Sequence, residues 1–137
     1  MIKIKFILIL VIIFSINKIA NSNVIEIKVK VNNEIITNID IDNEKKYLIF
    51  LNPKLIELDN KRIEKISKDS LITEIIKKNE LKKFYDFDKN QNIINNIEKK
   101  ILKNKNLENK SAFIKILKIN NLNYKIIKNK LQVEALW

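Results

Sequence analysis

Apolar and polar residues alternate at the start of the segment that follows residue 23, which indicates a β-strand rather than a helix. Four apolar side chains between Val24 and Val31 fall on one face of an extended chain: Ile25, Ile27, Val29 and Val31. A period of two residues is typical of a strand with one buried face. A shorter apolar run, Ile35-Ile36, follows the pair Asn32-Asn33. Asparagine tolerates the left-handed backbone of a tight turn better than most residues, so the two runs are predicted to form a β-hairpin.

Beyond Thr37 the apolar residues recur at spacings of three and four, which predicts amphipathic helices. Thr37 with Asp40 three residues later resembles a capping box, in which each residue accepts a hydrogen bond from the other's backbone. This pair predicts a helix over 38–50, which ends before Pro53 because proline cannot continue a helix.

Further capping residues predict the remaining helices. Asp59 caps a helix over 60–85, Asp88 caps one over 89–104, and Asn123 caps a last helix that continues to Trp137. A helix over 109–119 follows the polar stretch NKNLEN. The expected apolar stripes are Ile63, Ile66, Leu71, Ile72, Ile75, Ile76 and Phe84; Ile93, Ile94, Ile97, Ile101 and Leu102; Phe113, Ile114, Leu117 and Ile119; and Ile126, Ile127, Leu131 and Val133. The predicted fold is mainly α, with a short N-terminal β-hairpin followed by about five helices.

The first 22 residues have the three-part layout of a secretory signal peptide. Lys3 and Lys5 give a positive start, residues 6–16 form an apolar stretch, and Ala20-Asn21-Ser22 supplies small residues for cleavage. The stretch is short for a bilayer span, which needs about 20 residues. We therefore expect a signal peptide at 1–22, a domain at 23–137, a periplasmic location and no stable membrane span after cleavage. An uncleaved membrane anchor is the alternative.

The composition excludes most catalytic chemistry. The chain has no Cys, His or Gly, so it lacks a thiol nucleophile, a Ser-His-Asp triad and a glycine-rich phosphate loop. No residue set points to a cofactor or a metal ion, and none is expected. The formal net charge of +11 is typical of proteins that bind nucleic acid or anionic surfaces. Export argues against nucleic acid as the binding partner. Lysines on solvated helix faces are an alternative explanation of the charge.

The order of the elements resembles the N-terminal domain of the SurA-type periplasmic chaperones, whose relatives carry parvulin peptidyl-prolyl isomerase domains further along. Two segments carry the resemblance: VNNEIITNID at 31–40, preceded by Lys30 where the family has an apolar residue, and INNLNYKIIKNKL at 119–131. The likeness spans nearly all of 24–137. It implies that the chain is truncated at its C-terminal end, because the C-terminal helix that completes this domain in the family is absent. That missing segment of the same protein is then an expected partner of the domain.

The resemblance implies a holdase chaperone that binds unfolded outer-membrane proteins through apolar surface. Two alternatives stay open: part of a prolyl isomerase whose parvulin domain lies outside this chain, and a basic module that binds membrane surfaces through the lysine-rich stretches 99–105 and 125–130. Whether the chain belongs to an enzyme is undecided. The candidates for client binding, each of which can equally be a core residue, are Tyr47, Phe50, Phe84, Phe113, Leu136 and Trp137.

Overall fold

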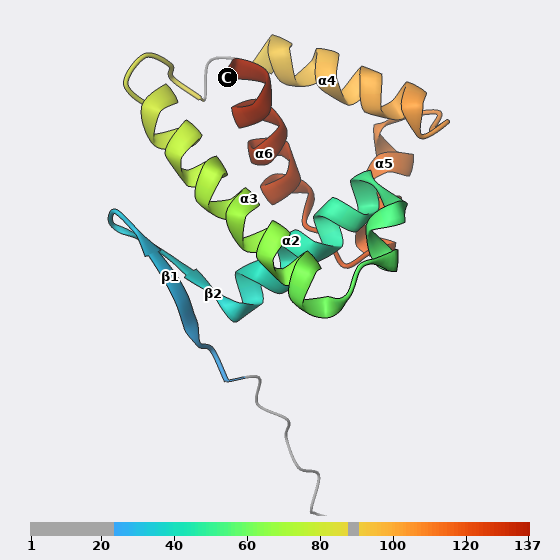
Figure 1. Cartoon of the computed structure of the whole chain (residues 1–137). Helices are drawn as coiled ribbons and strands as arrows, with labels where there is room; N and C mark the ends of the chain where they lie inside the picture. The colour runs from blue at the N-terminus through green and yellow to red at the C-terminus, as the bar shows by residue number, and fades with distance from the viewer. Residues whose placement is uncertain (1–23, 88–90) are drawn as a thin grey trace, which may run out of the picture.

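A hairpin followed by packed helices forms the described part of the chain, residues 24–87 and 91–137 of a computed structural model (Figure 1). The elements in order are β1 (Ile27–Val31), β2 (Glu34–Thr37), α2 (Asn38–Leu51), the 3-10 helix η1 (Pro53–Glu57), α3 (Asn60–Leu81), α4 (Gln91–Asn104), α5 (Lys110–Ile119) and α6 (Tyr124–Leu136). The predicted fold class is confirmed. The signal peptide at 1–22, the mature start at Asn23 and the Asp88 cap lie outside the described residues.

The hairpin is antiparallel and turns at Asn32, whose φ of 54° lies in the left-handed region, as predicted. The register of its two strands differs from the one that regular alternation of apolar and polar residues predicts. Val29 pairs with Ile36 whereas Ile27 pairs with Thr37, so one extra residue, Lys28, forms a β-bulge. Consecutive strand residues point to opposite faces, and the bulge therefore moves Ile27 away from the face of Val29. The prediction that Ile27 shares that face is wrong, and its side chain is exposed.

Local hydrogen bonds confirm three of the predicted helix caps. The Asp40 amide donates to the Thr37 hydroxyl at 3.2 Å, and the Thr37 amide donates to the Asp40 carboxylate at 2.8 Å, which completes the capping box. Asp59 accepts from the Arg62 amide at 3.0 Å and starts α3. Asn123 accepts from the first amides of α6. Each helix therefore begins where its capping residue predicts.

The end of α3 and parts of two apolar stripes differ from the predictions. The helix ends at Leu81 rather than at 85, because the amides of Lys83 and Phe84 donate to the carbonyls three residues earlier, Glu80 and Leu81, instead of continuing the four-residue pattern of an α-helix. Buried Ser67, whose hydroxyl donates to the Ile63 carbonyl, occupies the inner face of α3 instead of a larger apolar residue. The members of the predicted stripes that are exposed are Ile66, Ile76, Phe84, Ile119 and Ile126.

Helix α6 lies in the middle of the molecule, beside α3 and α4 (Figure 1). α2 crosses α3, and α5 connects α4 to α6. The largest cluster of buried apolar side chains comes from α2, α5, α6 and the loop before α6: Tyr47, Phe50, Phe113, Leu117, Leu122, Ile127 and Leu131. This core holds α2 and α6, two of the three helices that carry the site described next.

Candidate functional site

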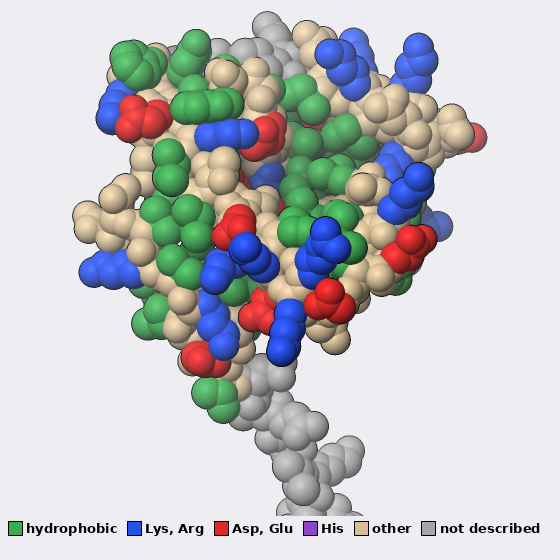
Figure 2. Space-filling view, in the orientation of Figure 1, with side chains coloured by type: hydrophobic (Ala, Val, Ile, Leu, Met, Phe, Trp, Pro, Cys, Tyr) green, Lys and Arg blue, Asp and Glu red, His purple; other side chains and the backbone are tan. Residues whose placement is uncertain are grey.

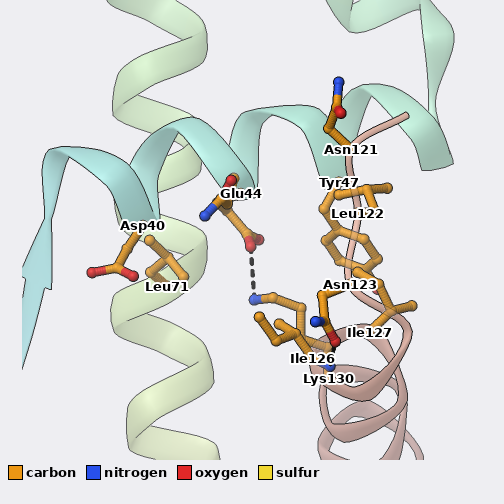
Figure 3. A pocket seen from close by; sticks show the side chains of 11 residues that line it. Asp40, Glu44, Tyr47, Leu71, Asn121, Leu122, Asn123, Ile126, Ile127 and Lys130 are labelled. Atoms are coloured by element: carbon orange, nitrogen blue, oxygen red, sulfur yellow. Dashed lines mark hydrogen bonds and ion pairs between the residues drawn. The ribbon is translucent and has the colours of Figure 1, made fainter. Parts of the chain in front are cut away.

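Three charged side chains meet at the junction of α2, α3 and α6, and they form the charge cluster Glu44–Glu74–Lys130. The Lys130 Nζ lies 2.7 Å from Glu44 Oε2 and also contacts Glu74 Oε2. Figure 3 shows Glu44 and Lys130 pointing toward each other between α2 and α6. The second Glu44 oxygen accepts a 2.7 Å hydrogen bond from the Ser70 hydroxyl. Glu44 is only 2% exposed, so this cluster is built into the interior of the protein.

The Lys130 ammonium group and the Glu44 carboxylate form a close ion pair in the interior of the protein. Two carboxylates share one ammonium group, and the Lys130 Nζ also lies 5.5 Å from the centre of the Tyr47 ring. Removing one partner of a buried charge group leaves an uncompensated charge, which is strongly destabilising. The cluster therefore constrains how the three helices pack.

The spacing of apolar residues does not predict this cluster, although one feature of the sequence points to it. Glu44 lies three residues from both Ile41 and Tyr47, on the buried face of α2. Lys130 lies on the buried face of α6 with Ile127 and Leu131. A lone acidic residue within one apolar stripe and a lone basic residue within another indicate a buried pair, because an unpaired buried charge is very costly.

The protonation of the cluster argues against a catalytic role. Burial lowers the pKa of Lys130, but the carboxylates of Glu44 and Glu74 outweigh it and hold the pKa above its ordinary value. A lysine that acts as a nucleophile or base needs a lowered pKa. Burial also raises the pKa of the Tyr47 phenol, so that side chain stays neutral. Within the described residues, no group of His, Cys, Asp or Glu has the arrangement of a metal site.

Two cavities flank the charge cluster and together form what we call the aliphatic groove. One has a volume of about 140 Å³ and the other about 200 Å³, and both are lined by Asp40, Leu71, Ile126 and Lys130. The larger lies between β2, α3 and α6, and its aliphatic walls are Ile35, Ile36, Leu71, Ile75 and Ile126. Ile35 and Ile126 are 53% and 52% exposed. The groove is thus a recess that solvent can reach, with aliphatic walls and with charged side chains along it, namely Glu34, Asp40, Glu74, Lys78 and Lys130.

A second polar cluster joins α4, α5 and α6. The buried Glu98 carboxylate accepts a hydrogen bond from the Tyr124 hydroxyl and lies 3.5 Å from Lys110 Nζ. Burial and the Glu98 hydrogen bond raise the pKa of Tyr124, and the hydrogen bond to Tyr124 raises the pKa of Lys110. Both groups keep their protons at neutral pH. This cluster also ties helices together rather than offering a reactive group.

The six predicted client-binding residues separate into two groups, and the fold does not bring them into one site. Tyr47, Phe50 and Phe113 belong to the buried core, with the Phe50 and Phe113 ring centres 6.5 Å apart. These three side chains are not on the surface of the folded domain. Phe84 and Trp137 are 78% and 63% exposed, and Leu136 is half-buried. Client binding by any of the six stays a prediction.

No family model, curated protein or solved structure matches this chain. The resemblance to the SurA-type domain therefore remains a prediction from the sequence. In the part of the chain that the structure describes, no helix has the length and apolar character that crossing a bilayer requires.

Proposed function

We propose that this chain is a holdase chaperone module that binds unfolded outer-membrane polypeptides in the periplasm. The aliphatic groove carries the proposal: it is an accessible recess whose aliphatic walls come from β2, α3 and α6, three elements that are far apart in the sequence. Burial of apolar surface is non-directional and needs no sequence code in the client. Such a recess suits a chaperone that binds many unfolded chains weakly.

The groove has features that favour an extended polypeptide over a small molecule. Its walls combine a β-strand with two helices, and the hairpin has only two strands, so its edges keep unpaired backbone groups that another chain can reach. Ile35 on β2, Ile126 on α6, and Leu71 and Ile75 on α3 all line the recess. Apolar side chains of a client can be buried between them.

Because several of the aromatic candidates are buried, the proposed client-binding site is the aliphatic groove instead. Three of the candidates from the sequence are core residues, so the surface that binds clients is mainly aliphatic in this proposal. Of the alternatives, an isomerase activity would reside outside the described residues, where a parvulin domain of a longer protein would lie. A proline-limited peptide assay on this chain is expected to show no acceleration above background.

The test is binding of an unfolded outer-membrane protein to groove variants. We expect Ile35→Asp combined with Ile126→Asp to weaken binding about tenfold or more, because each change removes apolar contact area worth about 1.5–3 kcal/mol when fully buried. The matched control is Ile56→Asp combined with Ile119→Asp. These residues are 72% and 70% exposed and do not line the groove. The control should bind like the wild type.

Salt separates this proposal from the basic-surface alternative. Apolar burial should depend little on ionic strength, whereas contacts through lysines weaken as ions screen charge over about 10 Å at 0.1 M. Equal loss of binding in the groove and control variants would refute the groove as the site. Tight, salt-sensitive binding to an anionic polymer with no binding to the unfolded client would instead support the basic-surface module.

A further inference from the structure

One end of the molecule exposes three aromatic side chains, Phe84, Tyr85 and Trp137, which we call the aromatic tip. Phe84 is 78% exposed, Tyr85 44% and Trp137 63%. Phe84 and Tyr85 stand in an ordered turn after α3, where their amides donate to the Leu81 carbonyl at 3.0 and 2.8 Å. This turn holds the two rings outward at the end of the helix.

Contacts between α3 and α6 place Trp137 at the same end. The Lys77 ammonium pairs with Glu134 at 2.8 Å and lies 6.0 Å from the centre of the Trp137 ring. The Gln132 side-chain amide donates to the Phe87 carbonyl, which joins α6 to the turn after α3. Figure 1 shows the end of α6 beside this turn. The three rings therefore belong to one region of the surface, and none of them lines the aliphatic groove.

Helix α4 starts near this end of the molecule and carries a row of lysines in its second half, which leads away from the aromatic tip. Its inner face carries Ile94 and Glu98, and its outer face carries Lys99, Lys100 and Lys103, all exposed. Among the ion pairs between described residues, none includes these three lysines. The acidic neighbour Glu98 turns inward to Tyr124 and Lys110. The row is therefore uncompensated positive charge.

The aromatic tip and the lysine row lie along the same side of the molecule. Figure 1 shows α4 extending across the top of the view from the end where α3 and α6 finish. In Figure 2, hydrophobic side chains are exposed over the end of α3, and lysine side chains project over α4. Exposed aromatic rings combined with neighbouring lysines are a pairing that the lipid–water interface favours, because the rings enter the headgroup region while the ammonium groups remain in water.

We propose that this surface binds peripherally to an anionic phospholipid bilayer. Lysines near such a surface each gain about 1 kcal/mol, and the rings add apolar contact that a soluble polyanion does not offer. The tip projects from the end of a helix rather than lining a recess, so it suits insertion between headgroups better than it suits capture of a peptide. The inference is independent of the proposed client site, because the two surfaces share no residue.

Trp137 is the only tryptophan in the chain, so its fluorescence reports on the aromatic tip directly. The experiment mixes the exported protein with vesicles of phosphatidylglycerol and phosphatidylcholine, or of phosphatidylcholine alone. We expect a blue shift of the emission and co-sedimentation with the anionic vesicles, both weakened by salt, and little change with the neutral ones. Phe84→Ala combined with Tyr85→Ala should reduce co-sedimentation several-fold.

Two lysine variants with equal loss of charge complete the test. Lys99→Gln, Lys100→Gln and Lys103→Gln together should lower vesicle partitioning up to about 100-fold, from about fivefold for each lysine. The control changes three lysines at the other end of the molecule, Lys61→Gln, Lys65→Gln and Lys68→Gln, and should partition close to the wild type.

Three results would overturn the proposal. The first is no shift of the Trp137 emission with anionic vesicles, and the second is an equal loss of partitioning in the two lysine variants. The third is a shift produced by a soluble unfolded polypeptide but not by vesicles, which would assign the aromatic tip to client binding. The groove variants Ile35→Asp and Ile126→Asp should leave partitioning unchanged, so failure here and failure of the chaperone proposal are distinguishable.

Discussion

Asparagine takes the part of glycine at the tight turns of this glycine-free chain. Asn32, Asn106 and Asn121 have φ angles of 54°, 52° and 55°, in the left-handed region. Asn121 follows α5, where the Leu122 amide donates to the Leu117 carbonyl at 2.8 Å and the Asn121 amide donates to the Lys118 carbonyl at 3.0 Å. These two bonds form a Schellman motif. The motif also brings Leu122 and Leu117 together in the core.

Asn121 should therefore be sensitive to the identity of its side chain. Asn121→Ala is expected to destabilise the fold by about 1 kcal/mol, because a residue with a Cβ and no local hydrogen bond is costly in the left-handed region. Asn121→Gly should be neutral or slightly stabilising, since glycine adopts this backbone freely. Urea unfolding of the three proteins measures the difference. Equal stability of the Ala and Gly variants would show that the turn does not require this conformation.

Tyr47 and Lys130 predict a loss of stability at alkaline pH. Both have a pKa raised in the folded protein. The folded state thus retains protons that the unfolded chain releases above about pH 10, the ordinary range of these groups. Their contribution is complete below that pH and is lost as the pH rises through the folded pKa values. The free energy of unfolding should fall above about pH 10, less steeply in Tyr47→Phe than in the exposed control Tyr85→Phe. Identical slopes would contradict this assignment.

At the scale of elements, the junction between the hairpin and α2 fixes the hairpin on the helical body. The Asn38 amide donates to the Glu26 carbonyl at 2.9 Å, and the Asn38 side chain bonds the Glu26 amide and the Val24 carbonyl, each at 2.9 Å. Thr37 closes β2 and caps α2 at the same point. The start of α2 therefore positions β2, and with it one wall of the aliphatic groove.

Loss of the cap at this junction should have a measurable cost. Thr37→Ala removes the hydroxyl that accepts from the Asp40 amide and should destabilise the protein by about 1 kcal/mol. The control is Thr73→Ala in the exposed middle of α3, whose hydroxyl donates only to the Asp69 carbonyl of its own helix. That change should be neutral or slightly stabilising, because alanine favours helices. Thermal unfolding compares them, and an unchanged melting temperature for Thr37→Ala would mean that the box does not stabilise α2.

For the whole molecule, the structural features that the sequence predicts correctly are those that depend on residues close together in the chain. The caps at Thr37, Asp59 and Asn123 depend on residues two or three positions away, and all three are confirmed. The bulge at Lys28 and the exposure of Ile119 depend on packing between elements, and the alternation and spacing of apolar residues do not reveal them. The charge cluster depends on contacts between residues 26 and 56 positions apart, as in the pairs Ser70–Glu44 and Lys130–Glu74. From the sequence one can recognise only that charged residues interrupt the apolar stripes, and not which residues they contact.

The division of the aromatic residues into core and surface gives a prediction for the whole fold. Phe113 is 1% exposed and belongs to the core cluster. Phe113→Ala should therefore lower the free energy of unfolding by about 3–5 kcal/mol, a large fraction of the total stability of a domain this size. Phe84→Ala should change stability by less than about 0.5 kcal/mol, because its ring is already in solvent. Urea unfolding separates the two. If Phe84→Ala proved as costly as Phe113→Ala, the ring would be packed inside the protein, and the aromatic tip would no longer offer a surface to lipid.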